Sequence, residues 1–252
     1  MQAAAPRSRA AGERQGGASV GVVIAVKNGE AYLAEALDSV CAQTRPASEI
    51  VVVDGHSTDQ SREIASRYPH TRVLLQTNRG FAGAWNEGIR ACRSEYVAIL
   101  DSDDRWAPGK LAAQVAALEA APEQGYVLAH TRFFRAPGVP LPPGFDRVDL
   151  SRDHSAPFPS VMLARRSLFD EVGFFEEQWE ISSDIEWFRR VADAGVLHAV
   201  LPEVLLWRRI HDTNLSYRPP DPQAFPKELL TILKRSLDRR RAARATHEKS
   251  PQ

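Results

Sequence analysis

The stretch Tyr96-Val97-Ala98-Ile99-Leu100-Asp101-Ser102-Asp103-Asp104-Arg105-Trp106 decides the fold. It begins with residues that favour β-structure and then places three carboxylates within four positions. Because a strand that is buried in a sheet carries no acid along its length, the first carboxylate marks the C-terminal end of the strand. In open α/β sheets, ligands bind in the crevice beyond these strand ends. We therefore expect a ligand site at this aspartate turn.

Three neighbouring carboxylates repel one another unless a cation or hydrogen-bond donors offset the repulsion. Their oxygen atoms suit a hard divalent ion such as Mg²⁺ or Mn²⁺, which a phosphate can share. A structural alternative is an acidic turn before a helix, with Asp104 as the cap and Pro108 in the first turn. The stretch by itself leaves both interpretations open.

Similar apolar runs on the N-terminal side predict a parallel sheet. Strands are expected at Val20–Val26, Glu49–Val53 and Arg72–Leu75, and each is followed by a segment with helical spacing of apolar residues. Strands that alternate with helices in this way form a largely parallel sheet with helices on both faces. Polar residues follow every strand and should therefore meet at one edge of the sheet.

After about residue 121 the alternation becomes irregular. The strands expected there are residues 126–134, 196–200 and 204–208. Ser182-Ser183-Asp184 should open a helix whose buried face holds Ile185, Phe188, Val191 and Ala192. Trp179 and Trp187 suit either the core or the face of a sugar.

Bulk composition excludes some classes of partner. The chain of 252 residues has 32 Lys and Arg against 32 Asp and Glu, so no overall field attracts nucleic acid. Cys41 and Cys92 stand alone in apolar helical contexts, which predicts two buried thiols in a reducing compartment. Residues 1–18 lack the apolar core of a signal peptide, and no run approaches the roughly 18 apolar residues that span a bilayer. We expect a disordered leader and a cytoplasmic protein.

Residues 218–252 form a basic tail with a helical pattern. Leu229, Leu230, Leu233 and Leu237 lie along one side of this helix, and arginines lie along the others. Such a helix can make peripheral contact with the inner face of a membrane, because basic amphipathic helices bind anionic interfaces. The simpler expectation is that the leucines cover apolar surface of the domain itself.

Three polar residues outside the aspartate turn are further candidates. Asp54 follows a buried strand and can accept hydrogen bonds from a nucleoside, or it can form an Asx turn. Asp184 lies at the start of a helix. Its carboxylate can interact favourably with the helix dipole there, or it can act as a general base. His211 follows an apolar strand, where a surface role is the commoner outcome and metal binding the alternative.

The order of motifs between residues 20 and 216 resembles family 2 glycosyltransferases. The resemblance rests on Val22-Val23-Ile24-Ala25-Val26-Lys27-Asn28-Gly29-Glu30-Ala31-Tyr32-Leu33, Asn78-Arg79-Gly80, Asn86-Glu87-Gly88-Ile89, the aspartate turn, Gly173-Phe174-Phe175, Ser183-Asp184 and His211. It implies a GT-A fold over residues 19–217, in which residues 19–121 bind a nucleotide-sugar and residues 122–217 bind the acceptor. It also implies metal-dependent, inverting transfer from a nucleoside diphosphate sugar, with UDP as the favoured nucleotide.

By position, the resemblance makes Asp101-Ser102-Asp103 the DxD motif of the family. Asp103 and His211 would hold Mn²⁺ or Mg²⁺, and Asp184 would be the catalytic base. The residues assigned to donor binding are Ala25, Asn28, Glu30, Asp54, Asn86, Asp101 and Ser102. The Q-x-x-R-W element of processive synthases is missing, which favours transfer of a single sugar to a glycan, lipid-linked or other hydroxyl acceptor.

Two other functions stay open. A non-catalytic binding module of the same fold would keep the nucleotide-sugar pocket, but retention of Asp101, Asp103, Asp184 and His211 argues against it. A nucleotidyltransferase would need a Gly-rich, basic loop after the first strand, which Lys27-Asn28-Gly29 does not supply.

Overall fold

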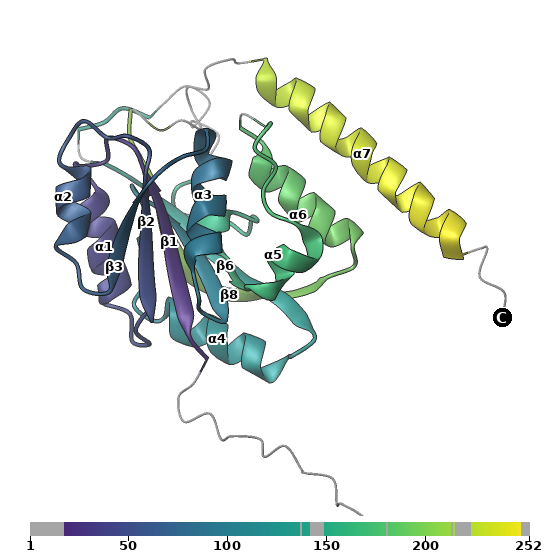
Figure 1. Ribbon diagram of the computed structural model, residues 1–252, viewed down its shortest axis with the longest axis horizontal. Helices are drawn as coiled ribbons and strands as arrows, with labels where there is room; N and C mark the ends of the chain where they lie inside the picture. Colours follow the sequence, from purple (N-terminus) through teal and green to yellow (C-terminus); the bar gives the residue numbers. More distant parts are fainter. Residues whose placement is uncertain are drawn as a thin grey trace, which may run out of the picture.

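The computed structural model describes residues 18–136, 138–141, 149–179, 181–212, 214 and 223–247, which form an α/β domain around one sheet (Figure 1). Eight strands pair in the order β3-β2-β1-β4-β7-β6-β8-β5. They are β1 (Val20–Val26), β2 (Glu49–Asp54), β3 (Thr71–Leu75), β4 (Tyr96–Asp101), β5 (Arg105–Trp106), β6 (Gln124–Arg135), β7 (Leu163–Arg165) and β8 (Leu197–Ile210). The helices are α1 (Leu33–Cys41), α2 (Ser61–Ser66), α3 (Gly80–Ala91), α4 (Lys110–Ala120), the 3-10 turn η2 (Pro159–Val161), α5 (Ser167–Val172), α6 (Ser183–Asp193) and α7 (Ala224–His247).

The first half confirms the parallel arrangement expected from the apolar runs. β1 pairs in parallel with both β2 and β4, and β2 pairs in parallel with β3. All residues of β1 are buried, because α1 and α2 lie on one side of these strands and α3 lies on the other (Figure 1). α3 packs so closely that a Cβ on Gly88 would lie 2.2 Å from Val23 Cγ1. The C-terminal ends of β1, β2 and β4 therefore share one edge of the sheet.

The second half extends this sheet with mixed pairing. β7 is antiparallel to β4 and to β6, whereas β6 and β8 are parallel. β8 is one strand of 14 residues where the sequence predicts two. Its register shifts where Leu201 pairs with Ala129 and Val204 pairs with His130. Because Pro202 has no amide proton for the ladder, the interruption in the sequence pattern corresponds to a bulge, and the strand continues beyond it.

α6 begins at the predicted position, and Phe188 and Val191 are buried as predicted, whereas Ile185 is only partly buried. Trp187 is fully buried, with its ring centroid 5.1 Å from that of Phe169. Trp179 lies beneath the guanidinium of Arg235, at 5.1 Å. Both tryptophans are therefore packing residues. Ala192 is exposed, which corrects the expectation that it shares the buried face.

α7 contacts α6 mainly through charged and hydroxyl side chains. Ile232 and Ser236 are buried against the domain, whereas Leu230, Leu233 and Leu237 are 70%, 43% and 52% exposed. The expectation that these leucines cover the domain is therefore wrong. The reason is that α6 presents Asp193 at this contact, and this carboxylate selects the face of α7 that carries hydrogen-bond donors.

Cys92 is buried as expected, but Cys41 is exposed, because it ends α1 away from the face that buries Leu37 and Val40. Within the described ranges, no helix combines the length and the apolar character needed to cross a bilayer. The leader up to residue 17, residues 218–222 and residues 248–252 lie outside the described residues, so the proposed domain boundaries stay predictions.

Candidate functional site

The aspartate turn is tied to the end of β8. β5 pairs with β8, with Trp106 opposite Leu206. One oxygen of the Asp104 carboxylate accepts the backbone N–H of Arg209 at 2.8 Å. Asp104 is therefore not a helix cap, and α4 begins at Lys110 without a side-chain cap. Burial, followed by the charges of the neighbouring aspartates, raises the pKa of Asp104 well above its ordinary value.

This pairing brings His211 to Asp103 across 108 positions of sequence. The Nε2 atom of His211 lies 2.8 Å from Asp103 Oδ2, and the same oxygen accepts the amide N–H of Asn214 at 3.0 Å. The backbone N–H of His211 donates to Asn214 Oδ1 at 2.7 Å, which fixes the turn after β8. The His211 ring also lies against Tyr32, with 4.8 Å between centroids. The structure thus brings together the two residues assigned to the metal.

Asp101 and Asp184 belong to the same electrostatic site. Burial and then the charge of Asp103 raise the pKa of Asp101 to about 6, and the charge of Asp184 adds to this effect. Burial also raises the pKa of Asp184, although Ile185 donates its backbone N–H to the carboxylate at 2.8 Å. The charge of the predicted base therefore acts on the aspartate turn.

Two arginines of β8 complete this edge, and neither was predicted from the sequence. The positive charge of Arg208 lowers the pKa of Asp101 and of Asp184, against the larger effect of burial. Arg209 donates from Nε to the carbonyl of Asp103 at 2.8 Å and from its terminal nitrogen to Glu35 at 2.5 Å. A pair of arginines at the end of an apolar strand could have indicated nearby acceptors such as carboxylates, because buried arginines require acceptors.

The loops after β1 and β2 bond to each other beside this turn. Asn28 has a φ of 53°, and its Oδ1 accepts the backbone N–H of Thr58 at 2.9 Å. Glu30 accepts a backbone N–H of the same loop at 3.0 Å. Asp54 is fully buried and accepts the N–H of Ser57 at 3.1 Å. These bonds preform a polar wall, and the nucleoside contacts of its residues stay predictions.

The remaining donor candidates divide into two places. Ala25 pairs with Asp101 between β1 and β4, and Ser102 follows it at the partly exposed turn. Asn86 lies apart from them and is buried in α3. Its Nδ2 donates to the carbonyl of Phe175 at 2.8 Å, and its Oδ1 accepts the N–H of Phe175 at 3.0 Å. Asn86 therefore anchors the loop that leads to α6.

The side chains at the aspartate turn fit a hard divalent cation. Asp103 offers a carboxylate oxygen, His211 an imidazole nitrogen and Asn214 an amide. A cation would relieve the repulsion that raises the pKa of Asp101. Among the residues that the structure describes, no three His, Cys, Asp or Glu side chains already form a metal-binding group. Further ligands would therefore come from the substrate or from water, as is usual for Mg²⁺.

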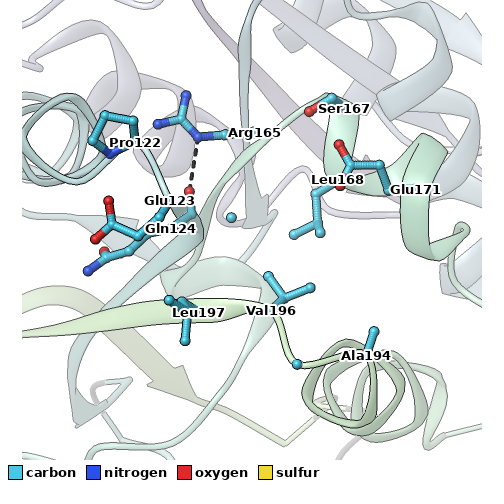
Figure 2. Close-up of a pocket in the computed structure, with 12 residues that line it drawn as sticks. Pro122, Glu123, Gln124, Arg165, Ser167, Leu168, Glu171, Ala194, Val196 and Leu197 are labelled. Atoms are coloured by element: carbon cyan, nitrogen blue, oxygen red, sulfur yellow. Dashed lines mark hydrogen bonds between the residues drawn. The ribbon is translucent and has the colours of Figure 1, made fainter. Parts of the chain in front are cut away.

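A cavity of about 430 Å³ lies at the opposite edge of the sheet (Figure 2). Its walls come from the starts of β6 and β8, the end of β7, and α5. The guanidinium of Arg165 at this cavity already donates to the carbonyls of Gln124 and Leu118, at 2.9 and 2.8 Å. None of the predicted site residues lines the cavity.

Comparison with known proteins gives the fold a context. The structure resembles residues 1–349 of S. aureus TarS in complex with UDP, with a TM-score of 0.64 and 21% identity over 85% of this chain and 64% of that one. The same TarS segment in complex with UDP-GlcNAc gives a TM-score of 0.63 and 21% identity over 78% of this chain and 60% of that one. The likeness confirms the expected GT-A fold, with its mostly parallel sheet.

Sequence relatives are also similar over most of this chain. An uncharacterized glycosyltransferase of Rickettsia typhi is 31% identical over 77% of this chain and 65% of the relative. The succinoglycan biosynthesis protein ExoO of Rhizobium meliloti is 30% identical over 77% of this chain and 61% of ExoO. The chain thus spans a little under two thirds of the length of these relatives. The family model described as Glycosyl transferase family 2 matches residues 21–172, and the chain belongs to this family.

Proposed function

We propose that this domain transfers a single sugar from a nucleoside diphosphate sugar to an acceptor hydroxyl, with inversion at the anomeric carbon and with a divalent cation. The observation that carries the proposal is the 2.8 Å contact between His211 and Asp103, which joins the two halves of the domain at the acidic edge. Family membership supports glycosyl transfer. UDP is the favoured nucleotide, because the structurally similar TarS is known in complexes with UDP and UDP-GlcNAc.

In this proposal, Asp184 removes the proton of the acceptor hydroxyl. A hydroxyl is a poor nucleophile until a base takes its proton, after which the oxygen attacks the anomeric carbon while the bond to the diphosphate breaks. One such displacement inverts the configuration at that carbon. The N–H of Ile185 and the charge of Arg208 both favour the ionised carboxylate that this role requires.

Asp103 and His211, with Asn214 beside them, would hold the cation. A divalent ion bound there would offset the charge that develops on the leaving diphosphate. Asp101 and Ser102 would lie near the ribose. Ala25, Asn28, Glu30 and Asp54 would line the nucleoside pocket, whose walls are already fixed by the bonds between the loops after β1 and β2.

The test is donor binding followed by turnover. We would measure the melting temperature of the protein with UDP-, GDP- and dTDP-sugars, each with Mn²⁺ and with EDTA. We expect one donor to raise the melting temperature only when the metal is present, because a ligand stabilises the state that binds it. Release of the nucleoside diphosphate with that donor and a panel of glycan and lipid-linked acceptors then measures transfer.

Variants of the cation residues separate the proposed site from a general effect of charge. Asp103→Asn and His211→Ala should lose the metal-dependent part of the stabilisation, whereas Asp212→Asn, next to His211 and exposed, should keep it. Equal donor binding by all three variants would refute the cation assignment. Metal-dependent donor binding with no turnover on any acceptor would favour the alternative, a non-catalytic nucleotide-sugar-binding module of the same fold.

A further inference from the structure

α7 has one face that contacts the domain and a second face whose side chains are exposed. On the first face, Arg235 donates to Glu176 at 2.8 Å, and Glu228 accepts the backbone N–H of Ile181 at 3.4 Å. These contacts fix the segment that runs directly into α6. Figure 1 shows α7 along the outer side of α6, with its other side facing away from the sheet.

The outer face is apolar along its centre. Leu230, Leu233 and Leu237 are 70%, 43% and 52% exposed, and their spacing of three and four residues places them on one stripe of the helix. Three large exposed aliphatic side chains in a row are unusual on a surface that contacts only water. The stripe, defined by these three leucines, therefore offers a surface for an apolar partner.

Cations border the leucine stripe on one side. Lys227, Lys234 and Arg241 follow one another at intervals of seven residues, about two helical turns, and all three are exposed. Asp238 is the acid near this border, and it lies 3.9 Å from Arg241. Lys227 and Lys234 form no ion pair with any residue in the described part of the chain, so their charge is available to an anionic partner.

We propose that the leucine stripe of α7 docks the domain on an anionic lipid bilayer. The leucines would enter the boundary between headgroups and acyl chains, while the lysines and Arg241 would contact lipid phosphates. A second copy of the chain fits this face less well, because antiparallel pairing of the stripes would bring the two cationic borders together. Docking in this way would also hold the segment that leads to Asp184 on the side of α7 that faces away from the lipid.

Vesicle binding by the full chain tests this proposal without donor or acceptor, so its outcome is independent of the proposed glycosyl transfer. We expect co-sedimentation with vesicles of phosphatidylcholine mixed with phosphatidylglycerol, and at least tenfold weaker binding to pure phosphatidylcholine. The triple variant Leu230→Gln, Leu233→Gln, Leu237→Gln should bind the mixed vesicles at least tenfold more weakly. Lys227→Gln with Lys234→Gln should bind severalfold more weakly and depend less on salt concentration.

Leu197→Gln is the matched control, because Leu197 is 57% exposed at the start of β8, away from α7. It should bind the vesicles as the unmodified protein does. All variants alter exposed side chains, and equal melting temperatures would show that each is folded. Absence of binding to the anionic vesicles, or equal binding by the triple variant, would overturn the proposal. A dimer in solution that the triple variant abolishes would assign the stripe to a second copy.

Discussion

Asp193 on α6 and Asp101 at the aspartate turn are carboxylates of one domain in opposite surroundings. The side chain of Asp193 is 2% exposed, and Ser236, Arg239 and Arg240 of α7 donate to it at 2.8 to 3.0 Å. Burial by itself would raise the pKa of Asp193, but these bonds outweigh burial and lower it. Asp101 has acidic neighbours, and burial together with their charge raises its pKa to about 6.

The direction of the pKa shift distinguishes a carboxylate that stabilises the fold from one that serves a ligand. A carboxylate whose charge is compensated stabilises the folded state, whereas carboxylates that repel one another cost stability and are retained where a ligand uses them. Substitutions at the α6–α7 contact should therefore change the free energy of unfolding. Substitutions at the aspartate turn should instead change binding and turnover.

The largest effect should separate two aspartates of the same helix. Asp184→Asn removes the proposed base, and we expect the rate of transfer to fall by about 10²- to 10⁴-fold, with donor affinity unchanged. Asp193→Asn, near the other end of α6, should leave the rate per folded molecule within a few-fold of normal. Steady-state kinetics together with donor titration would measure both, and normal turnover by Asp184→Asn would contradict the base assignment.

Asp193→Asn should act on stability instead. The amide keeps the shape but loses the charge that three donors of α7 compensate, so the free energy of unfolding should fall by roughly 2 kcal/mol. Urea denaturation at pH 7 measures this change. The control is Asp238→Asn, whose exposed carboxylate lies 3.9 Å from Arg241 and should contribute almost nothing. Equal effects of the two substitutions would show that α7 does not depend on its contact with Asp193.

Asp101→Asn should change the free energy of unfolding in the opposite direction. Because the pKa of Asp101 in the folded protein is about 6, above its ordinary value, the ionised carboxylate costs stability at pH 7. Its replacement by an amide should raise the free energy of unfolding by ~1–2 kcal/mol in buffer with EDTA. This gain should disappear as the pH falls through 6 toward 4, since the unmodified carboxyl then takes up a proton. Destabilisation by Asp101→Asn at pH 7 would contradict the proposed repulsion.

The smallest effect concerns the acid limb of the pH–rate profile. Burial raises the pKa of Asp184, so transfer should begin to decline at a pH above the ordinary value of an aspartate and then fall tenfold per pH unit. Near neutral pH the change should be only a few-fold. Rates measured with saturating donor and Mn²⁺ would show the limb, and a rate that is constant down to pH 4 would exclude Asp184 as its source.

The parallel half was the part of the fold that sequence patterns predicted best. Runs such as Val20–Val26 are apolar without interruption because both faces of these strands are covered, and they leave little choice of secondary structure. β8 was harder to predict, because Pro202 interrupts its pattern although the strand continues through a bulge. The outward direction of the leucines of α7 was predicted wrongly, since hydrophobicity alone does not reveal that Asp193 attracts the other face.

For the site, the residues could be predicted but several of their connections could not. Asp103 and His211 were identified by resemblance. Their contact depends on the pairing of β5 with β8, and a strand of two residues is too short to be predicted from the sequence pattern. Arg209 and Tyr32 were missed as site residues because their roles arise only when distant segments meet. A helix cap at Asp104 was one of two interpretations that the sequence left open, and the structure shows instead that its carboxylate accepts the backbone N–H of Arg209.

The position of β8 in the sheet has a consequence for protein synthesis. β8 lies between β6 and β5, and the residues that follow it reach back 108 positions to Asp103. A nascent chain whose first 120 residues have left the ribosome contains all the strands of the parallel half, but it lacks the histidine that contacts Asp103. The strands of the parallel half are therefore synthesised before the proposed cation site is complete.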